Sequence, residues 1–117
     1  MAANPIKRVP AVFYCNSASK EPVRDWLKKL APADRKILGL DIATVEFGWP
    51  VGMPLCKALG QGLWEVRSNL TGNRISRVVF CVHAGQMVLL HAFIKKTQKT
   101  PPGDLALAQK RKKEIEQ

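Results

Sequence analysis

Three consecutive segments in the second half of the chain alternate apolar and polar side chains, and only short turns separate them. The segments span residues 63–70, 75–83 and 87–96, with turns at residues 71–73 and 84–85. A period of two is typical of β-strands, and turns this short join antiparallel neighbours. The sequence therefore predicts an antiparallel sheet built from these three strands.

The first half of the chain has helical spacing instead. Apolar residues recur every three or four positions in two segments that lie on either side of a very short turn before Pro32. Ser19 is the expected N-cap of the first helix, and Gly48 is the expected end of the second. Residues 6–14 indicate a further strand, and Pro10 within it favours an edge position or a bulge. Residues 104–116 indicate a final, lysine-rich helix.

These elements define the expected architecture. We expect one α+β domain over residues 1–117, in which an N-terminal strand and an αα-hairpin pack on the antiparallel sheet and a helix ends the chain. Residues 1–10 lack the apolar segment of a signal peptide, and no apolar run is long enough to span a bilayer. These features favour a cytoplasmic protein.

The charge of the chain constrains its partners. Nineteen Lys and Arg residues against nine Asp and Glu give a formal charge of +10. Such an excess favours RNA, DNA or an acidic protein as partner, although an inert basic surface is the alternative. The basic run at residues 110–113 either steers RNA binding or is a solvated helix face. Cys15, Cys56 and Cys81 lack ligand-like spacing, so we expect buried free thiols and no metal site.

Alternation places two arginines side by side on one face of the sheet. A turn centred on Gly72 sets Arg67 opposite Arg77. Like charges directly opposite each other destabilise a sheet unless an anion lies between them, so the pair indicates a phosphate site. Glu65 lies on the same face and is the alternative partner, in which case the face is a solvated salt-bridge surface.

The third strand extends this row of side chains. A turn centred on Gly85 sets Arg77 opposite Phe93, and His91 and Lys95 flank Phe93 on the same face. Phe93 is either part of the core or an exposed ring that stacks a base beside the cations. His91 lacks acidic or cysteine partners that would complete a metal site.

An ordered set of segments in this half of the chain resembles the RelE/HigB superfamily of bacterial toxins, and its phage-associated HigB-type branch in particular. The most specific segment runs from Phe93 through Lys95, Lys96 and Thr97 to Pro101. The likeness extends from Glu21 onward and includes the helical pair. The other matching segments are residues 59–67, 77–80, 89–92 and 108–111.

The resemblance implies the toxin of a type II toxin–antitoxin system, an endoribonuclease that cuts mRNA, generally in the ribosomal A site. It also implies a tightly bound antitoxin, often one with a helix-turn-helix. RNA carries its own nucleophile, the 2′-OH beside the scissile phosphate, so no metal or other cofactor is expected. Two alternatives remain: a non-catalytic nucleic-acid-binding module, or a degenerate toxin retained for antitoxin binding.

The resemblance also suggests the site residues. Arg67 and Arg77 would bind the phosphate and its developing charge, with Lys95 or His91 transferring protons. Some relatives use a C-terminal tyrosine or a histidine–aspartate set, and we find neither after Pro101, so the acid and the base stay open. The predicted RNA-binding residues are Lys57, Phe93, Lys96 and Lys99.

Overall fold

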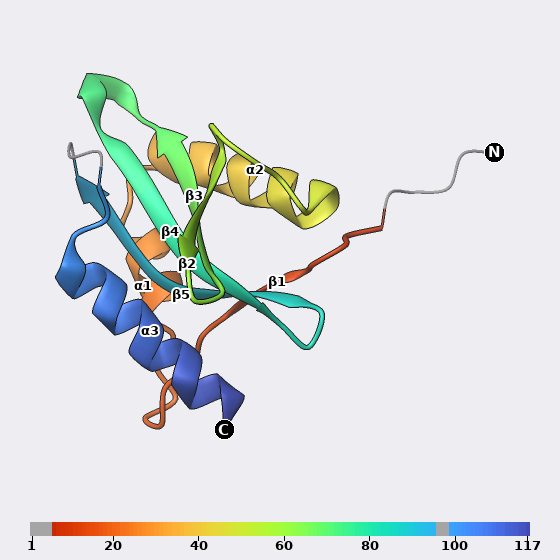
Figure 1. The fold of residues 1–117 in the computed structure, drawn as a ribbon. Coiled ribbons are helices and arrows are strands. Elements are labelled where there is room, and N and C mark those ends of the chain that lie inside the picture. The colour runs from red at the N-terminus through yellow and green to blue at the C-terminus, as the bar shows by residue number, and fades with distance from the viewer. Residues whose placement is uncertain (1–5, 96–98) are drawn as a thin grey trace.

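The computed structural model describes residues 6–95 and 99–117 (Figure 1). Within them, five strands and three α-helices follow one another in the order β1-α1-α2-β2-β3-β4-β5-α3. No helix among the described residues has both the length and the apolar surface needed to cross a membrane. The helices are α1 Pro22–Lys28, α2 Pro32–Gly48 and α3 Pro102–Glu116, and the strands are β1 Ala11–Phe13, β2 Cys56–Gly60, β3 Leu63–Asn69, β4 Ile75–His83 and β5 Gln86–Lys95.

The strands form one sheet in the order β1-β5-β4-β3-β2, and the predicted α+β class is confirmed. The pairs β2–β3, β3–β4 and β4–β5 are antiparallel. The outer strand β1 lies parallel to β5, so the sheet is mixed rather than wholly antiparallel. Parallel neighbours need a long crossover connection between them. Two helices and three strands separate β1 from β5 along the chain and provide that connection. β2 was not predicted from the sequence, and β1 is shorter than the strand predicted over residues 6–14.

The helix boundaries follow the prolines. Each of the three helices begins at a proline, where the missing N–H group costs no hydrogen bond. The prediction of Ser19 as an N-cap was wrong, because its φ of 60° places it in the preceding turn and Glu21 occupies the cap position. The predicted end of the second helix at Gly48 is confirmed.

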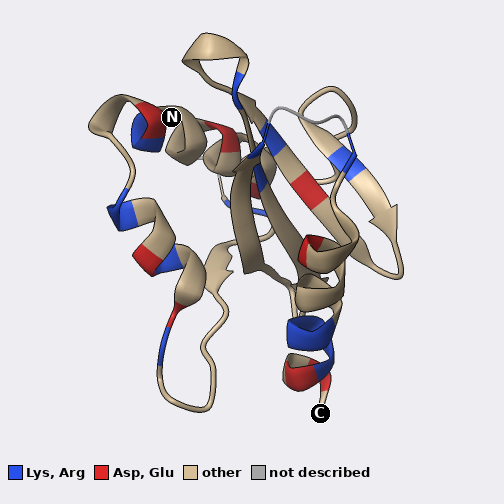
Figure 2. Cartoon of the chain, turned by 90° about the vertical axis from the view of Figure 1, so that its left-hand side faces the viewer, with Lys and Arg blue, Asp and Glu red and all other residues tan. Residues whose placement is uncertain are grey.

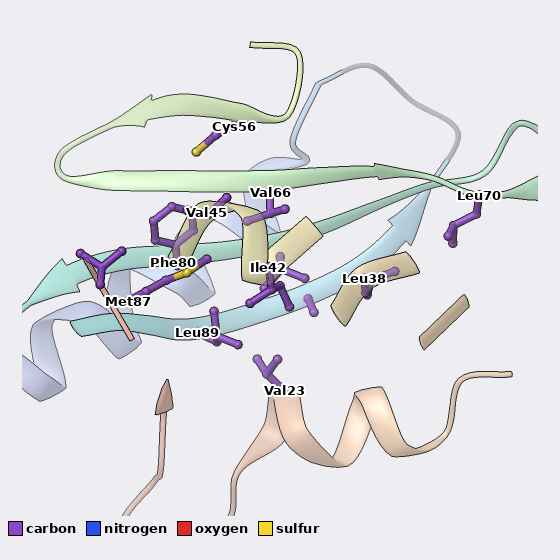
Figure 3. Packing of buried hydrophobic residues seen from close by; sticks show 13 residues of the cluster. Val23, Leu38, Ile42, Val45, Cys56, Val66, Leu70, Phe80, Met87 and Leu89 are labelled. Carbon is purple, nitrogen blue, oxygen red and sulfur yellow. The ribbon is translucent and has the colours of Figure 1, made fainter. Parts of the chain in front are cut away.

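The sheet lies between the helices. α1 and α2 cover one face, and α3 covers the other (Figure 1, Figure 2). The stripe predicted from helical spacing, Leu38, Ile42 and Val45, is buried against the first face, where Val66 and Phe80 meet it (Figure 3). A smaller apolar cluster under α3 supports the second face.

The loop after α2 closes one end of the larger core. The ring of Trp49 packs edge-on against Trp64 and Phe80, with centroid separations of 5.0 and 5.5 Å. Edge-to-face contacts of this kind add to the stabilisation that burial provides. This packing joins the start of the 49–54 loop to the core.

The β4–β5 hairpin contains a bulge that changes which face the side chains occupy. Phe80 is paired with Leu89, but the preceding residue Val79 is paired with His91, so Leu90 is an extra residue in β5. Strict alternation predicts Leu89 on the same face as His91. That prediction was wrong, because Leu89 packs toward α1 and α2, whereas Leu90 packs toward α3.

The predicted register of the basic row is nevertheless confirmed. Arg67 is paired with Arg77, and Arg77 is paired with Phe93. The β4–β5 turn consists of Ala84 and Gly85, both with positive φ, as two-residue hairpins require. The two-residue turn alone would shift the strand pairing by one residue from the prediction. The extra residue in β5 compensates for this shift, so Arg77 pairs with Phe93, as a turn centred on Gly85 predicts.

Candidate functional site

The sheet face beneath α3 carries a group of charged side chains that we call the α3-side cluster. Two neighbouring cross-strand rows supply most of it. One row runs from Lys57 through Glu65 and Val79 to His91, and the next contains Arg67, Arg77 and Phe93. The cluster consists of Lys57, Glu65, Arg67, Arg77, His91, Phe93, Lys95 and the α3 residue Asp104.

Asp104 joins the two side chains predicted to transfer protons. Its Oδ1 lies 2.7 Å from Nε2 of His91, and its Oδ2 accepts a hydrogen bond of 3.1 Å from Nζ of Lys95. Asp104 occupies the first turn of α3, where the helix dipole favours a carboxylate. Because the dipole and both partners favour a negative charge here, the helix start is well suited to hold an ionised aspartate.

The protonation of this group follows from its surroundings. Burial raises the pKa of Asp104, but the hydrogen bonds from His91 and Lys95 and their charges outweigh burial, so the pKa lies below its ordinary value. An ionised carboxylate only accepts hydrogen bonds, and Nε2 of His91 must therefore carry the proton it shares with Asp104. The other ring nitrogen, Nδ1, is then the one that can take up a proton.

No histidine–aspartate set lies after Pro101, as the sequence shows, but the fold forms one from a residue on each side of that proline. His91 and Asp104 lie 13 residues apart, on a strand and on a helix, and meet only because α3 crosses the sheet above β5. In the sequence, Asp104 could be recognised as an acidic residue in the first turn of a helix that begins after Pro101. That signal indicates a favourable helix start, but it does not indicate which strand residue the carboxylate contacts.

The two paired arginines share a buried carboxylate. Nε of Arg67 lies 3.8 Å from Oε1 of Glu65, whose side chain is 0% exposed. Thr100 donates a hydrogen bond of 2.7 Å to the other carboxylate oxygen. Arg77 is also fully buried and donates from Nη1 to the backbone oxygen of Lys99 at 2.7 Å. Burial lowers the pKa of Arg77, the charge of Glu65 opposes that effect and the charge of Arg67 adds to it.

This geometry corrects two expectations about the arginines. The negative charge of Glu65 acts on both arginines, so their pairing does not require a phosphate, and the pair is buried rather than solvated. Direct contact between Arg77 and a phosphate does not fit a side chain with 0% exposure. Arg67 keeps 13% of its side chain exposed and is the arginine that can meet a ligand.

The predicted RNA-binding residues differ in how far they reach the surface. Phe93 is 7% exposed, and its ring lies 5.7 Å from Nζ of Lys95 and 5.8 Å from Cζ of Arg77. Its role is therefore that of a core ring beneath the cations, and base stacking on it does not fit the structure. Lys57 is half-buried in β2 and Lys99 is exposed, whereas Lys96 lies outside the described residues.

The basic run on α3 is not a uniform solvated face. Nη1 of Arg111 donates a hydrogen bond of 2.7 Å to the backbone oxygen of Leu90, and its Cζ lies 5.3 Å from the centre of the Tyr14 ring. The hydroxyl of Tyr14 hydrogen-bonds to Glu114, and this bond, together with burial, raises the pKa of Tyr14. Arg111 therefore fastens α3 to the bulge of β5.

The cysteines are free, as expected, but not all are buried. Cys15 is exposed, which corrects the prediction for that residue. Burial raises the pKa of Cys56 and of Cys81 to about 11, so both thiols stay protonated at neutral pH. Among the described residues, no group of three or more His, Cys, Asp and Glu side chains could hold a metal ion.

Comparison with known proteins places the chain in a family. The family of phage-derived Gp49-like proteins (DUF891) matches residues 25–113. This chain is a Gp49-like protein. The match spans most of α1, all of α2, strands β2 to β5 and most of α3, and so includes every residue of the α3-side cluster. None of the curated proteins compared with the chain matches it.

Proposed function

We propose that this Gp49-like protein is the toxin of a type II toxin–antitoxin system and cuts mRNA on the ribosome. The Gp49-like family is toxin-like and related to RelE and HigB, which agrees with the resemblance drawn from the sequence segments. The charge of +10 suits a polyanionic substrate. The observation that carries the proposal is the contact of Asp104 with both His91 and Lys95, beside the row that contains Arg67.

In the proposed reaction, the RNA supplies the nucleophile. Nδ1 of His91 takes the proton from the 2′-OH as its oxygen attacks the adjacent phosphorus, while Asp104 stabilises the imidazolium that forms. The bond between phosphorus and the 5′-oxygen breaks, and this oxygen receives a proton from the Lys95 ammonium group. The products are a 2′,3′-cyclic phosphate end and a 5′-hydroxyl end.

The remaining residues of the cluster act through charge. The exposed edge of Arg67 and the ammonium of Lys95 neutralise the charge that grows on the phosphate oxygens. Glu65 is buried beneath them and forms an ion pair with Arg67, so it is a positioning residue. Lys57, half-buried in β2, binds the RNA backbone in this proposal.

The proposal includes partners and a location. The toxin would act in the cytoplasm on mRNA bound to the ribosome. A cognate antitoxin, expected to contain a helix-turn-helix, would neutralise it. Assignment to the phage-associated HigB-type branch is part of the same proposal and rests on the ordered segments that end at Pro101.

One observation favours a second candidate function. Arg77 is fully buried and is hydrogen-bonded to the backbone of Lys99, so an arginine predicted to bind phosphate is turned inward. A degenerate toxin that only binds its antitoxin, or a non-catalytic nucleic-acid-binding module, would have no need of an exposed arginine at this position.

Expression of the chain alone in a bacterium tests the proposal. Growth is followed after induction, and primer extension maps the ends of a reporter mRNA. Growth arrest with new ends inside codons supports the toxin, provided that His91→Ala removes both effects. Lys36→Ala, which removes an exposed charge from α2, is the matched control and should behave as wild type. Normal growth with intact message supports the second candidate.

A further inference from the structure

A pocket next to the proposed catalytic histidine has no role in the reaction described above. It has a volume of about 200 Å³ and lies beside β5. Its walls come from α1, β5 and α3, and the residues that line it are Pro22, Val23, Trp26, His91, Ala92 and Arg111.

The two larger polar side chains of this pocket are fixed from outside it. Arg111 is held by its hydrogen bond to the Leu90 oxygen and by the Tyr14 ring. Among the described residues this is the one hydrogen bond of its guanidinium, so its other N–H groups can serve a ligand. His91 is oriented by Asp104. A ligand would therefore meet donors that are already in position.

The apolar part of the pocket includes an aromatic side chain. The indole of Trp26 is half-buried, and Pro22 and Ala92 extend the apolar surface. A flat ring with acceptor atoms along one edge suits this combination, because the ring can stack on the indole while the edge accepts from Arg111. Arginine recognises guanine in this way, through the O6 and N7 atoms.

We infer that this pocket binds one base of the RNA substrate, preferably guanine, next to the phosphate that His91 helps to cleave. The inference rests on the proposed function, because it takes RNA as the substrate. An acidic side chain of a protein partner could also meet Arg111, but it would leave the indole surface of Trp26 unused. The aromatic and cationic walls together favour the base.

Titration with a single nucleotide tests this inference in the absence of ribosomes. Guanosine 5′-monophosphate is added to the full chain, and the indole N–H signals of Trp26, Trp49 and Trp64 are followed by NMR. The Trp26 signal should shift, whereas the signals of the packed rings Trp49 and Trp64 should stay in place. Ribose 5-phosphate, which lacks the base, should leave the Trp26 signal unchanged.

Matched variants identify the groups responsible. Trp26→Leu and Arg111→Gln should each weaken nucleotide binding by about tenfold, the effect of losing one stacking or hydrogen-bonding partner. Lys36→Ala removes one exposed charge from α2 and should bind as wild type. If Arg111→Gln does not fold, as its amide spectrum would show, Trp26→Leu decides the outcome.

Two results would overturn the inference. Equal shifts with ribose 5-phosphate would mean that only the phosphate is attracted. A Trp26 shift with N-acetylglutamate but none with the nucleotide would assign the pocket to an acidic protein partner.

Asp104→Asn, which is expected to lose cleavage, should still bind the nucleotide. Nucleotide binding without mRNA cleavage would thus refute the proposed function alone, and cleavage without nucleotide binding would refute the pocket alone.

Discussion

Nε2 of His91 lies 2.7 Å from Oδ1 of Asp104, and the bulge at Leu90 is what allows this contact. Leu89 packs into the core beneath α1 and α2, so regular alternation would turn His91 toward that core as well. The extra residue places His91 on the α3 face instead. Bulges often redirect a side chain in this way next to active sites.

Removal of the Asp104 carboxylate should slow RNA cleavage. Asp104→Asn keeps the size of the side chain but no longer fixes the proton on Nε2 of His91 or stabilises its imidazolium form. We expect the rate of mRNA cleavage on ribosomes to fall by about 100-fold or more. Lys36→Ala, which removes an exposed charge from α2, serves as the control. An unchanged rate in Asp104→Asn would remove Asp104 from the mechanism.

The low pKa of Asp104 makes part of the stability depend on acidity. A carboxyl group whose pKa is lower in the folded chain stabilises the fold above its unfolded pKa, near 4, and this contribution disappears as the pH falls through the folded pKa. The difference in unfolding free energy between wild type and Asp104→Asn should therefore shrink below about pH 4. Urea unfolding between pH 7 and pH 3 measures it. A difference that stays constant over this range would contradict the assignment.

The buried carboxylate of Glu65 should be important for stability. Glu65→Gln leaves the buried Arg77 and the largely buried Arg67 without their negative partner, which we expect to cost about 3–5 kcal/mol of unfolding free energy. Urea unfolding is the measurement. Glu116→Gln, which breaks an exposed pair with Lys112, should cost less than about 0.5 kcal/mol. Similar losses for the two variants would show that Glu65 is not a counter-charge.

Two leucines on α2 test the description of the core. Leu38 is 0% exposed and Leu40 is 61% exposed, although only Gly39 lies between them. Leu38→Ala should lower the unfolding free energy by about 2–5 kcal/mol, because it opens a cavity between α2 and the sheet. Leu40→Ala should change it by less than about 0.5 kcal/mol. Comparable losses in chemical denaturation would mean that α2 presents a different face to the sheet.

Local patterns were sufficient to predict much of the fold. The helical stripe of Leu38, the antiparallel strands and the pairing of Arg67 with Arg77 all depend on neighbours in sequence or on short turns. The parallel pairing of β1 with β5 depends on a long connection, and the segment of β2 is short, so neither produces a clear periodic signal. The pairing of Arg77 with Phe93 was predicted correctly although the bulge was not. A two-residue turn followed by one extra residue in β5 gives the same strand pairing as the three-residue turn that was assumed.

The candidate site was harder to predict than the fold. Basic residues and His91 could be placed on one face from alternation, but whether each side chain is exposed depends on what covers the sheet. The contacts of Thr100 and Lys99 bury Glu65 and Arg77, and the path of α3 brings Asp104 to His91. These contacts join segments far apart in the sequence, and no local pattern encodes them.

Direct analysis of the RNA ends is the most decisive measurement for the proposed function. Purified ribosomes carrying a defined mRNA are mixed with the wild-type chain, with His91→Ala or with Lys36→Ala, and the new ends are characterised chemically. The proposal predicts a 2′,3′-cyclic phosphate and a 5′-hydroxyl from wild type and Lys36→Ala, and at least about 100-fold slower cleavage by His91→Ala. Intact message with the wild-type chain, or equal cleavage by His91→Ala, would contradict it.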